Sequence, residues 1–315
     1  MKGFDRMRKK QVDLDAVARF NRISMPANVL FSCLFILLGI ICIIPVVFVA
    51  IISLSSNQSI QSVGYSFLPN EWSFDSYRYL WRERASIGQA VFVSIGVTLV
   101  GTVTGLFLTS TMGYVISRPT FKLKKFFTGL IFIPMLFGGG LVASYLINTR
   151  MLGLQNSYLA LILPIAVSSF NCIIMRTYFQ TTIPDSIIES AKIDGAKQLM
   201  IFFQMILPIS LPALATIGLM LSIGYWNDWF SAMLYLQSDH YEMFPLQYVL
   251  ISIERNMEFL TKNAQNLSPD ASSVKLPAES TRMAIVMVVV LPIACSYPFF
   301  QKYFISGLTI GAVKG

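Results

Sequence analysis

Apolar positions gather into six long segments, and polar stretches separate these segments along the whole chain. About 20 predominantly apolar residues in a helix are enough to cross the hydrocarbon core of a bilayer. The segments meet that length, and they are 28–53, 88–117, 126–148, 158–178, 205–226 and 283–303. A helix satisfies its own backbone polar groups in lipid. The pattern therefore predicts an all-α membrane protein with six transmembrane helices.

Glycines mark special positions in two of these spans. In the second span, Gly101 and Gly105 have small-xxx-small spacing, which lets two helices approach closely. In the third span, the run Gly138–Gly140 is expected to bend or unwind the helix. Unwound backbone at that depth is tolerated only against protein or a water-filled cavity. We therefore expect close helix packing at the first site and a break at the second.

The composition agrees with a membrane protein. Hydrophobic residues make up 55% of the 315 residues and charged residues 13%, with a mean hydropathy of +0.63. A soluble domain carries about a quarter charged residues. The four cysteines lie inside apolar segments and predict neither a disulfide framework nor metal ligands; they are Cys33, Cys42, Cys172 and Cys295. The single histidine, His240, lies in a polar stretch and is expected at the surface.

Basic residues predict the orientation in the membrane. The arm before residue 28, the stretches 118–125 and 176–204, and the chain end from residue 302 together hold 16 of the 24 Lys and Arg residues. Cytoplasmic loops of membrane proteins carry an excess of Lys and Arg. Both termini and the stretch 176–204 are therefore predicted to be cytoplasmic. The net charge of +8 reflects this bias and the anionic inner leaflet, and it is no argument for nucleic acid binding.

The chain contains no apparent energy source of its own. No Asp, Glu, Lys, Arg or His lies in the middle of any predicted span, whereas proton-coupled carriers normally need such groups. The chain also lacks the G-x-x-x-x-G-K-[ST] phosphate loop. We therefore predict a transporter subunit rather than an enzyme, with no catalytic residue, no metal site and a partner that supplies the energy.

The polar stretch between the fourth and fifth spans is predicted to be a helix-turn-helix. Residues 182–185 are typical of a capped helix start, with Thr182 at the N-cap. The apolar residues that follow share one helical face: Ile187, Ile188 and Ala191. Asp194-Gly195 favours a sharp turn, and a second short helix follows over 196–206. A bent hairpin of this kind with an apolar face can fit a groove on another protein.

This stretch resembles the cytoplasmic loop of permease subunits of binding-protein-dependent ABC importers. That loop reads E-A-A, three residues, G, nine residues, I-x-L-P, and the counterparts here are Glu189-Ser190-Ala191, Gly195 and 205–208. Ser190 replaces the usual middle Ala, and Met205 the usual Ile. The resemblance implies the type I ABC importer permease fold, in which this loop is the coupling helix docked into the ATPase subunit.

The coupling residues implied by the resemblance are Glu189, Ser190, Ala191, Asp194, Gly195 and Ala196. Asp194-Gly195-Ala196 also matches the form that the loop takes in carbohydrate importers. The alternative for the whole stretch is an amphipathic interfacial helix without a partner. For Glu189, the alternatives are charge-assisted contact with basic groups of the ATPase, or helix capping and a pair with Lys192.

Two further stretches resemble the smaller, six-span permease of maltose-type carbohydrate importers. Residues 225–230 are similar to the W-N-x-F stretch at the outer end of the fifth span, and residues 297–315 are similar to that family's C-terminus. In the maltose-type relative the tail reaches between the ATPase subunits. The resemblance therefore implies an ATPase interface at Gly311, Lys314 and Gly315.

Candidate sugar-binding residues lie near one membrane boundary. Aromatic platforms beside amides recognise the apolar faces and hydroxyls of a sugar. The groups at this boundary are Tyr225, Trp226, Asn227 and Trp229, and Asn171 offers an amide within the fourth span. The alternative is an interfacial aromatic belt with an interhelical hydrogen bond. The segment 227–281 is expected outside the cytoplasm, and 262–281 reads as an exposed loop. That loop either enters the binding protein, as in the maltose-type family, or is a flexible insertion.

These observations predict a cytoplasmic arm over 1–27, a six-span permease domain over 28–304 and a cytoplasmic tail over 305–315. Within the domain, the coupling helices are 184–206. The predicted function is import of sugars, with oligosaccharides favoured, across a bacterial cell membrane. The implied partners are a second homologous permease, two ATPase subunits and an extracytoplasmic sugar-binding protein. This chain binds no cofactor, and the ATPase binds ATP and Mg. The alternatives are a permease for a polyamine, phosphate or peptide, or a membrane-embedded enzyme or assembly factor.

Overall fold

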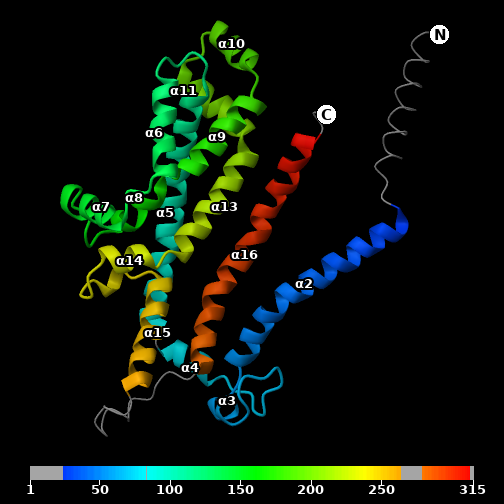
Figure 1. Cartoon of the computed structure of the whole chain (residues 1–315), viewed down its shortest axis with the longest axis vertical. Helices are drawn as coiled ribbons and strands as arrows, with labels where there is room; N and C mark the ends of the chain where they lie inside the picture. The colour runs from blue at the N-terminus through cyan, green and yellow to red at the C-terminus, as the bar shows by residue number, and fades with distance from the viewer. Residues whose placement is uncertain (1–23, 83, 264–278, 313–315) are drawn as a thin grey trace.

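The computed structural model describes residues 24–82, 84–263 and 279–312. Within these ranges the regular structure is helical, and the one isolated β-bridge joins Ser55 to Trp72. Most helices run along the long axis of the molecule (Figure 1). The helix α10 lies at one end, called here the α10 end, and α3 and α4 lie near the other, called the α3 end.

The helices, in chain order, are α2 (Met25–Ser53), α3 (Asn57–Val63), α4 (Asp75–Arg82), α5 (Arg84–Ser117), α6 (Lys124–Leu136), α7 (Leu141–Leu146), η1 (Ile147–Met151), α8 (Tyr158–Ala166), α9 (Ser169–Thr182), α10 (Asp185–Ile193), α11 (Gln198–Ile201), η2 (Phe202–Ile206), α12 (Leu207–Ile209), α13 (Leu211–Asn227), α14 (Phe230–Tyr235), η3 (Tyr241–Met243), α15 (Leu246–Asn263) and α16 (Glu279–Ala312). Here η1 and η2 are π-helical and η3 is a 3-10 helix.

Five of the six predicted spans correspond to helices or helix pairs of sufficient length and apolarity. Within the described ranges, α2 and α5 are long enough to cross a membrane unbroken. Three pairs reach that length only as bent units, with bends of 119° between α6 and α7–η1, 50° between α8 and α9, and 80° between α11–α12 and α13. The sixth predicted segment lies in α16. The all-α fold is confirmed, and the count of six spans stays a prediction.

The sharpest bend falls where the sequence predicts it. α6 ends at Leu136, α7 begins at Leu141, and the glycine run Gly138–Gly140 lies between them. Gly140 has φ of 79°, a left-handed conformation that glycine adopts without steric cost. The third predicted span is therefore broken by its own glycines.

The core forms where α5 meets α8, α9 and α13, and glycines allow the contact. A Cβ at Gly101 would lie 2.5 Å from the ring of Tyr225. A Cβ at Gly105 would lie 2.8 Å from the backbone oxygen of Ala166, and one at Gly113 would lie 3.0 Å from Cβ of Met175. A side chain at any of these positions forces its neighbour to shift. The close packing predicted for Gly101 and Gly105 is confirmed.

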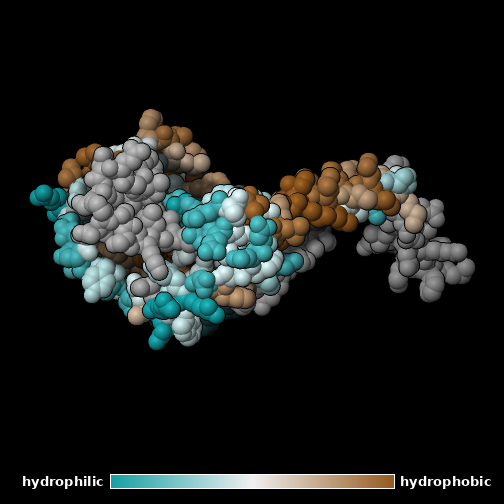
Figure 2. Space-filling model, turned by 90° about the horizontal axis from the view of Figure 1, so that it is seen from below, coloured by the Kyte–Doolittle hydropathy of each residue, from teal (hydrophilic) through white to brown (hydrophobic). Residues whose placement is uncertain are grey.

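The helix α2 stands apart from this core. Only 6% of an 18-residue apolar stretch of α2 is buried, against 28% of the corresponding stretch of α5. In Figure 2, viewed from the α3 end, it forms a hydrophobic arm that projects to one side of the molecule. α2 packs against α16, and Ser53 at its end shares a hydrogen bond with the hydroxyl of Tyr77 over 2.9 Å. Most of the apolar surface of α2 therefore contacts no other part of the described chain.

The segment after α13 is more ordered than the sequence indicates. It contains α14, η3 and α15, and Lys262, expected at the start of an exposed loop, lies in α15. At the other edge, Ser280 is 3% exposed in α16 and receives a 2.8 Å hydrogen bond from Ser76. The expected loop is therefore wrong at both edges, because its ends pack as helix; residues 264–278 lie outside the described part.

Candidate functional site

The candidate site is the stretch from α10 to α11, where the predicted helix-turn-helix is confirmed. The turn between the helices is closed by two backbone hydrogen bonds, from Gly195 to the oxygen of Lys192 at 3.0 Å and from Ala196 to the oxygen of Ala191 at 2.9 Å. Gly195 has φ of 80°, and a Cβ placed there would meet no atom within 4 Å. Glycine is required here by backbone conformation, since the space around it is open.

The start of α10 differs from the prediction. Thr182 is the last residue of α9, and Pro184 occupies the N-cap of α10 without a side-chain hydrogen bond. The prediction that Thr182 caps this helix is therefore wrong. Pro184 holds an extended backbone with ψ of 137°, which separates the two helices sharply. The acid in the first turn, Asp185, accepts a 3.0 Å hydrogen bond from Nη1 of Arg118 on the neighbouring helix end.

The two faces of α10 have different surroundings. Ile188 and Ala191 are 4% and 6% exposed and belong to the main core cluster of the chain. The apolar face of α10, expected to contact a partner, thus packs largely against the core of this chain. Only Ile187 on that face is half-buried. Ala191, one of the predicted coupling residues, therefore packs inward.

The outer face of α10 and the turn is exposed. Its polar members are Glu189, Ser190, Lys192 and Asp194, and its apolar member Ile193 is 85% exposed. Within the described part of the chain, Glu189 forms no ion pair or side-chain hydrogen bond, so the alternative pair with Lys192 is not formed. Ala196 is half-buried behind the turn. A charged, unpaired surface around an exposed isoleucine can contact another protein.

The helix α11 continues this surface. Leu199 is 72% exposed, whereas the side-chain amide of Gln198 donates a 2.6 Å hydrogen bond to the hydroxyl of Tyr114 on α5. A cavity of about 430 Å³ opens between α5, the following turn and α11, lined by Tyr114, Arg118, Phe121, Lys192, Gln198 and Phe202 among others. The site therefore combines an exposed ridge with a partly polar hollow beside it.

Two of the predicted sugar-binding residues hold helices together. Tyr225 is 3% exposed, and its hydroxyl donates a 2.7 Å hydrogen bond to the backbone oxygen of Ile162 in α8. Trp226 is 7% exposed, and its Nε1 donates to the backbone oxygen of Val289 in α16 at 3.2 Å. Both side chains use their polar atoms to fasten α13 to its neighbours.

The other predicted sugar-binding residues lie elsewhere. Oδ1 of Asn227, an exposed residue, accepts a 3.1 Å hydrogen bond from Gln247, and the guanidinium of Arg255 lies 5.4 Å from the ring centre of half-buried Trp229. Asn171 is 5% exposed in the first turn of α9. Asn227 is the last residue of α13, and Trp229 follows two positions later.

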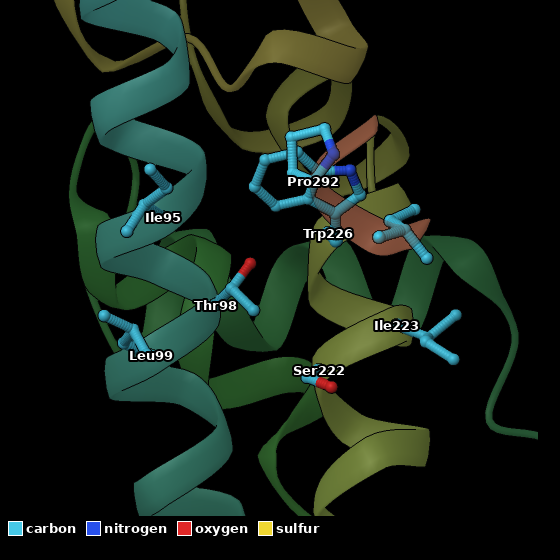
Figure 3. Close-up of a pocket in the computed structure, with 8 residues that line it drawn as sticks. Ile95, Thr98, Leu99, Ser222, Ile223, Trp226 and Pro292 are labelled. Carbon is cyan, nitrogen blue, oxygen red and sulfur yellow. The ribbon is translucent and has the colours of Figure 1, made fainter. Parts of the chain in front are cut away.

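Trp226 also lines a cavity of about 230 Å³ between α5, α13 and α16 (Figure 3). The lining is apolar apart from the hydroxyls of Thr98 and Ser222 and the Trp226 ring nitrogen, which is already bonded to Val289. None of the other four predicted residues lines it. The five residues therefore do not share this cavity, and the substrate path stays a prediction.

The C-terminal interface residues are only partly described. Gly311 lies in the last turn of α16, which runs to Ala312, and Lys314 and Gly315 lie outside the described residues. The first part of the predicted tail 305–315 is therefore continuous with α16. No group of three or more potential metal ligands occurs in the described part of the chain.

Sequence reasoning missed the pair Arg118 and Asp185. Arg118 counted only as one of several basic residues in a loop, and Asp185 only as part of a helix start. The available signal was a single arginine directly at the end of an apolar span, followed much later by an acid at the start of the coupling stretch. Neither residue type is unusual at such a position, so the pairing could not be read from the sequence.

Comparison with known proteins finds a matching family and similar relatives. Residues 101–310 match the family described as "Binding-protein-dependent transport system inner membrane component". The polygalacturonan/rhamnogalacturonan transport system permease protein YtcP of Bacillus subtilis is 37% identical over 281 residues, covering 89% of this chain and 95% of the relative. The arabinooligosaccharides transport system permease protein AraQ of the same organism is 29% identical, covering 91% and 96%.

A solved structure is also similar. The crystal structure of a bacterial ABC transporter involved in import of the acidic polysaccharide alginate contains a chain that matches with a TM-score of 0.75. The two sequences are 28% identical, and the match covers 90% of this chain and 99% of the other. The similarity extends over nearly the whole length in both fold and sequence.

Proposed function

Because the chain belongs to the family of inner membrane components of binding-protein-dependent transport systems, and has the type I ABC importer permease fold, we propose that it imports oligosaccharides. The observation that carries this proposal is the outer face of α10. Glu189, Lys192 and Ile193 are exposed there, and neither charged residue forms an ion pair or side-chain hydrogen bond in the described part of the chain. The sequence also lacks the phosphate-loop motif of ATPases. The sugar is proposed from the relatives, since permeases for pectin fragments and arabinooligosaccharides are similar over most of the chain.

The partners follow from the family. A binding-protein-dependent system has a soluble protein that delivers the solute and an ATPase that supplies the energy. In our proposal two ATPase subunits bind the α10 end, and a second, homologous permease completes the membrane part. ATP and Mg bind to the ATPase, and this chain binds no cofactor. The apolar, exposed surface of α2 supports a position in lipid or against that second permease.

The α10 end is proposed to face the cytoplasm, together with both termini, in a bacterial cell membrane. The excess of basic residues in the arm, the 118–125 loop and the coupling stretch supports this orientation. The α3 end, with α14 and α15, then faces the binding protein. Gly311, Lys314 and Gly315 are proposed to contact the ATPase subunits.

The mechanism we propose converts motion of the ATPase into tilting of helices. When the ATPase subunits close on ATP, they displace the outer face around Glu189, Ser190 and Asp194. Ile188 and Ala191 pass the displacement into the core, because both are packed there. The bends at either side of this core, 50° between α8 and α9 and 80° before α13, are the places where helices can reorient. The result is alternating access powered by the partner.

The path of the sugar is proposed to run past exposed Asn227 and half-buried Trp229, at and just after the end of α13. Asn227 and Trp229 offer an amide and an aromatic face there, while Tyr225 and Trp226 hold the helices that form the wall. Asn171 supplies a buried amide at the bend before α9. This assignment separates residues that touch sugar from residues that shape the path.

Reconstitution tests the proposed function. The chain, its partner permease and the ATPase are placed in proteoliposomes with ATP inside and the binding protein outside. Uptake of radiolabelled oligosaccharides is compared with uptake of polyamines, phosphate and peptides. We expect ATP-dependent uptake of an oligosaccharide and no uptake of the polyamines, phosphate or peptides. Uptake of a non-sugar solute instead would contradict the substrate assignment, and uphill uptake by this chain without an ATPase would contradict the mechanism.

A further inference from the structure

We infer that Tyr114 and Arg118, at the α10 end of α5, anchor both helices of the coupling stretch to the core, and that Arg118 is a positioning residue for coupling. The inference rests on the proposed function and names the route by which force reaches the spans. Tyr114 in the last turn of α5 and Arg118, the residue that follows the helix, lie four positions apart, and each reaches a different helix of the coupling stretch.

Arg118 is buried, and each of its three guanidinium nitrogens donates a hydrogen bond. Its side chain is 10% exposed, and its Nη1 donates to Oδ1 of Asp185 in α10 over 3.0 Å. Its Nη2 donates to the backbone oxygen of Phe179 in α9 at 3.3 Å, and its Nε to Oγ of Ser117 at 2.9 Å. One guanidinium thus joins α5, α9 and α10. A planar fork of donors is the side chain best suited to three acceptors in fixed directions.

Tyr114 makes the second connection. Its ring lies 5.1 Å from the Arg118 guanidinium carbon, and its hydroxyl accepts the hydrogen bond from Gln198 in α11. The same ring contacts those of Phe179 and Phe202 at centroid distances of 5.8 and 5.1 Å. Both helices of the coupling stretch are therefore fastened to the same turn of α5.

The connection to α10 has no substitute among the described residues. Of the side chains in α10, only that of Asp185 forms a hydrogen bond or ion pair with another helix there, and the rest of the attachment is apolar packing by Ile188 and Ala191. Asp185 is 58% exposed whereas Arg118 is not. The pair is rooted in α5 and presents its acid at the surface, so a displacement of α10 pulls directly on α5.

α5 is suited to carry this displacement along the molecule. It is a continuous helix of 34 residues that runs from the α10 end toward the α3 end (Figure 1). There Ser94 accepts a 2.8 Å hydrogen bond from the backbone N–H of Leu246, and Gln89 donates to the backbone oxygen of Glu242 at 3.1 Å. An anchor at Arg118 therefore links the coupling stretch to the segment that precedes α15.

The test uses the assembled transporter and measures distances as well as activity. Spin labels are attached at Lys122, after α5, and at Ser190, on the outer face of α10, after replacement of the four native cysteines. In the wild type we expect the distance between labels to stay constant when ATP binds, because α5 and α10 move together. In Arg118→Met the distance is expected to change on ATP binding, since α10 then moves alone.

The activity readout is the ratio of ATP hydrolysis with and without the loaded binding protein. We expect this ratio to fall about tenfold in Arg118→Met, and Arg118→Lys to recover part of it because the ion pair survives without the fork. Arg78→Met is the matched control, since Arg78 pairs with Asp75 only at the surface. Asp185→Ala replaces the test if Arg118→Met fails to assemble, and it is expected to give the same change in label distance.

Equal label distances and an unchanged ratio in Arg118→Met or Asp185→Ala would overturn the inference. A wild-type complex whose ATP hydrolysis shows no response to a loaded binding protein contradicts the proposed function instead. The spin-label experiment needs ATP and the ATPase but no sugar. An incorrect substrate assignment therefore leaves the test of the anchor intact.

Discussion

Two stretches singled out by the same family resemblance, 189–196 and 225–229, are built in opposite ways. In the first, Glu189 and Lys192 are exposed and unpaired, and the chain uses only the inner face of the helix for its own packing. In the second, the polar atoms of Tyr225 and Trp226 are buried and bonded to the backbone of other helices. The first leaves its polar groups for a partner, and the second uses them to hold the fold.

This difference separates what each stretch can do. An exposed, unpaired charge costs the isolated chain little, because water solvates it, and it becomes valuable only when a partner supplies an opposite charge. A buried hydroxyl bonded across helices fixes their relative position, and losing its partner is costly. The account therefore predicts that variants of Glu189 and Lys192 affect function without affecting stability, and that variants of Tyr225 and Trp226 do the reverse.

The largest expected effect breaks the packed side of the comparison. In Gly101→Leu, the new side chain meets the ring of Tyr225, since even a Cβ there would lie 2.5 Å away. Overpacking of a tight core costs about 1–3 kcal/mol or more, so we expect the complex to fail to assemble. Size-exclusion chromatography of the detergent-solubilised complex measures this. A Cβ at Gly88 on the same helix would meet nothing within 4 Å, and Gly88→Leu is expected to assemble. Equal assembly of both variants would contradict the packing account.

The next effect breaks the exposed side. In Gly195→Trp, we expect transport and stimulated ATP hydrolysis to be lost while membrane insertion remains normal. The turn needs φ of 80°, and a bulky ring would stand on the surface where the ATPase is proposed to dock. Uptake in proteoliposomes and membrane fractionation give the two readouts.

Gly64→Trp is the matched control for that variant. Gly64 has the same φ of 80° and open surroundings, but it lies after α3 at the opposite end of the molecule. Both substitutions therefore place a bulky residue at a positive φ, but at different ends of the molecule. Normal uptake in Gly195→Trp, or equal loss in both variants, would show that the turn has no special contact with a partner.

A smaller effect is expected from Glu189→Gln, which keeps the shape and removes one charge from the outer face. Loss of one charge-assisted contact costs about 1 kcal/mol, or about fivefold in affinity for the ATPase. The melting temperature of the permease should not change, because Glu189 forms no bond within the described part of the chain. Titration of the ATPase against permease-containing nanodiscs measures the affinity, and an unchanged affinity would assign the contact to other residues of this face.

The smallest functional effect is expected from Tyr225→Phe. It removes the hydrogen bond to Ile162 and keeps the ring against Gly101. We expect stability to fall by about 1 kcal/mol, seen as a lower melting temperature, with the KM for uptake unchanged. Trp229→Ala should do the reverse, raising KM with little change in melting temperature. A raised KM in Tyr225→Phe would instead place this hydroxyl on the sugar path.

The elements that the sequence predicts well are those set by local chemistry. The apolar segments, the break at Gly138–Gly140 and the turn at Asp194-Gly195 depend on hydrophobic length and on glycine, and each is found where expected. The close packing at Gly101 was also predictable from spacing, although its partner Tyr225 was not. Spacing says that a helix approaches and does not say which one.

The elements that the sequence does not predict depend on long-range contacts. Arg118 and Asp185 are 67 positions apart, and each has an ordinary local interpretation as a loop cation or a helix-start acid. The packing of the apolar face of α10 could not be predicted either. The same periodicity is expected whether that face binds a partner's groove or packs against the chain's own core. Only the packing of α9 against α5 decides that Ile188 turns inward.

The central claim is that the outer face of α10 contacts the ATPase, and site-specific photo-cross-linking tests it most directly. A photoreactive residue is placed at Ile193, which is 85% exposed on α10, and separately at Val63, which is 52% exposed on α3 at the opposite end. In an assembled complex that hydrolyses ATP, the account predicts an adduct with the ATPase from position 193 and none from position 63. Absence of that adduct from position 193, or an equal one from position 63, would contradict the account.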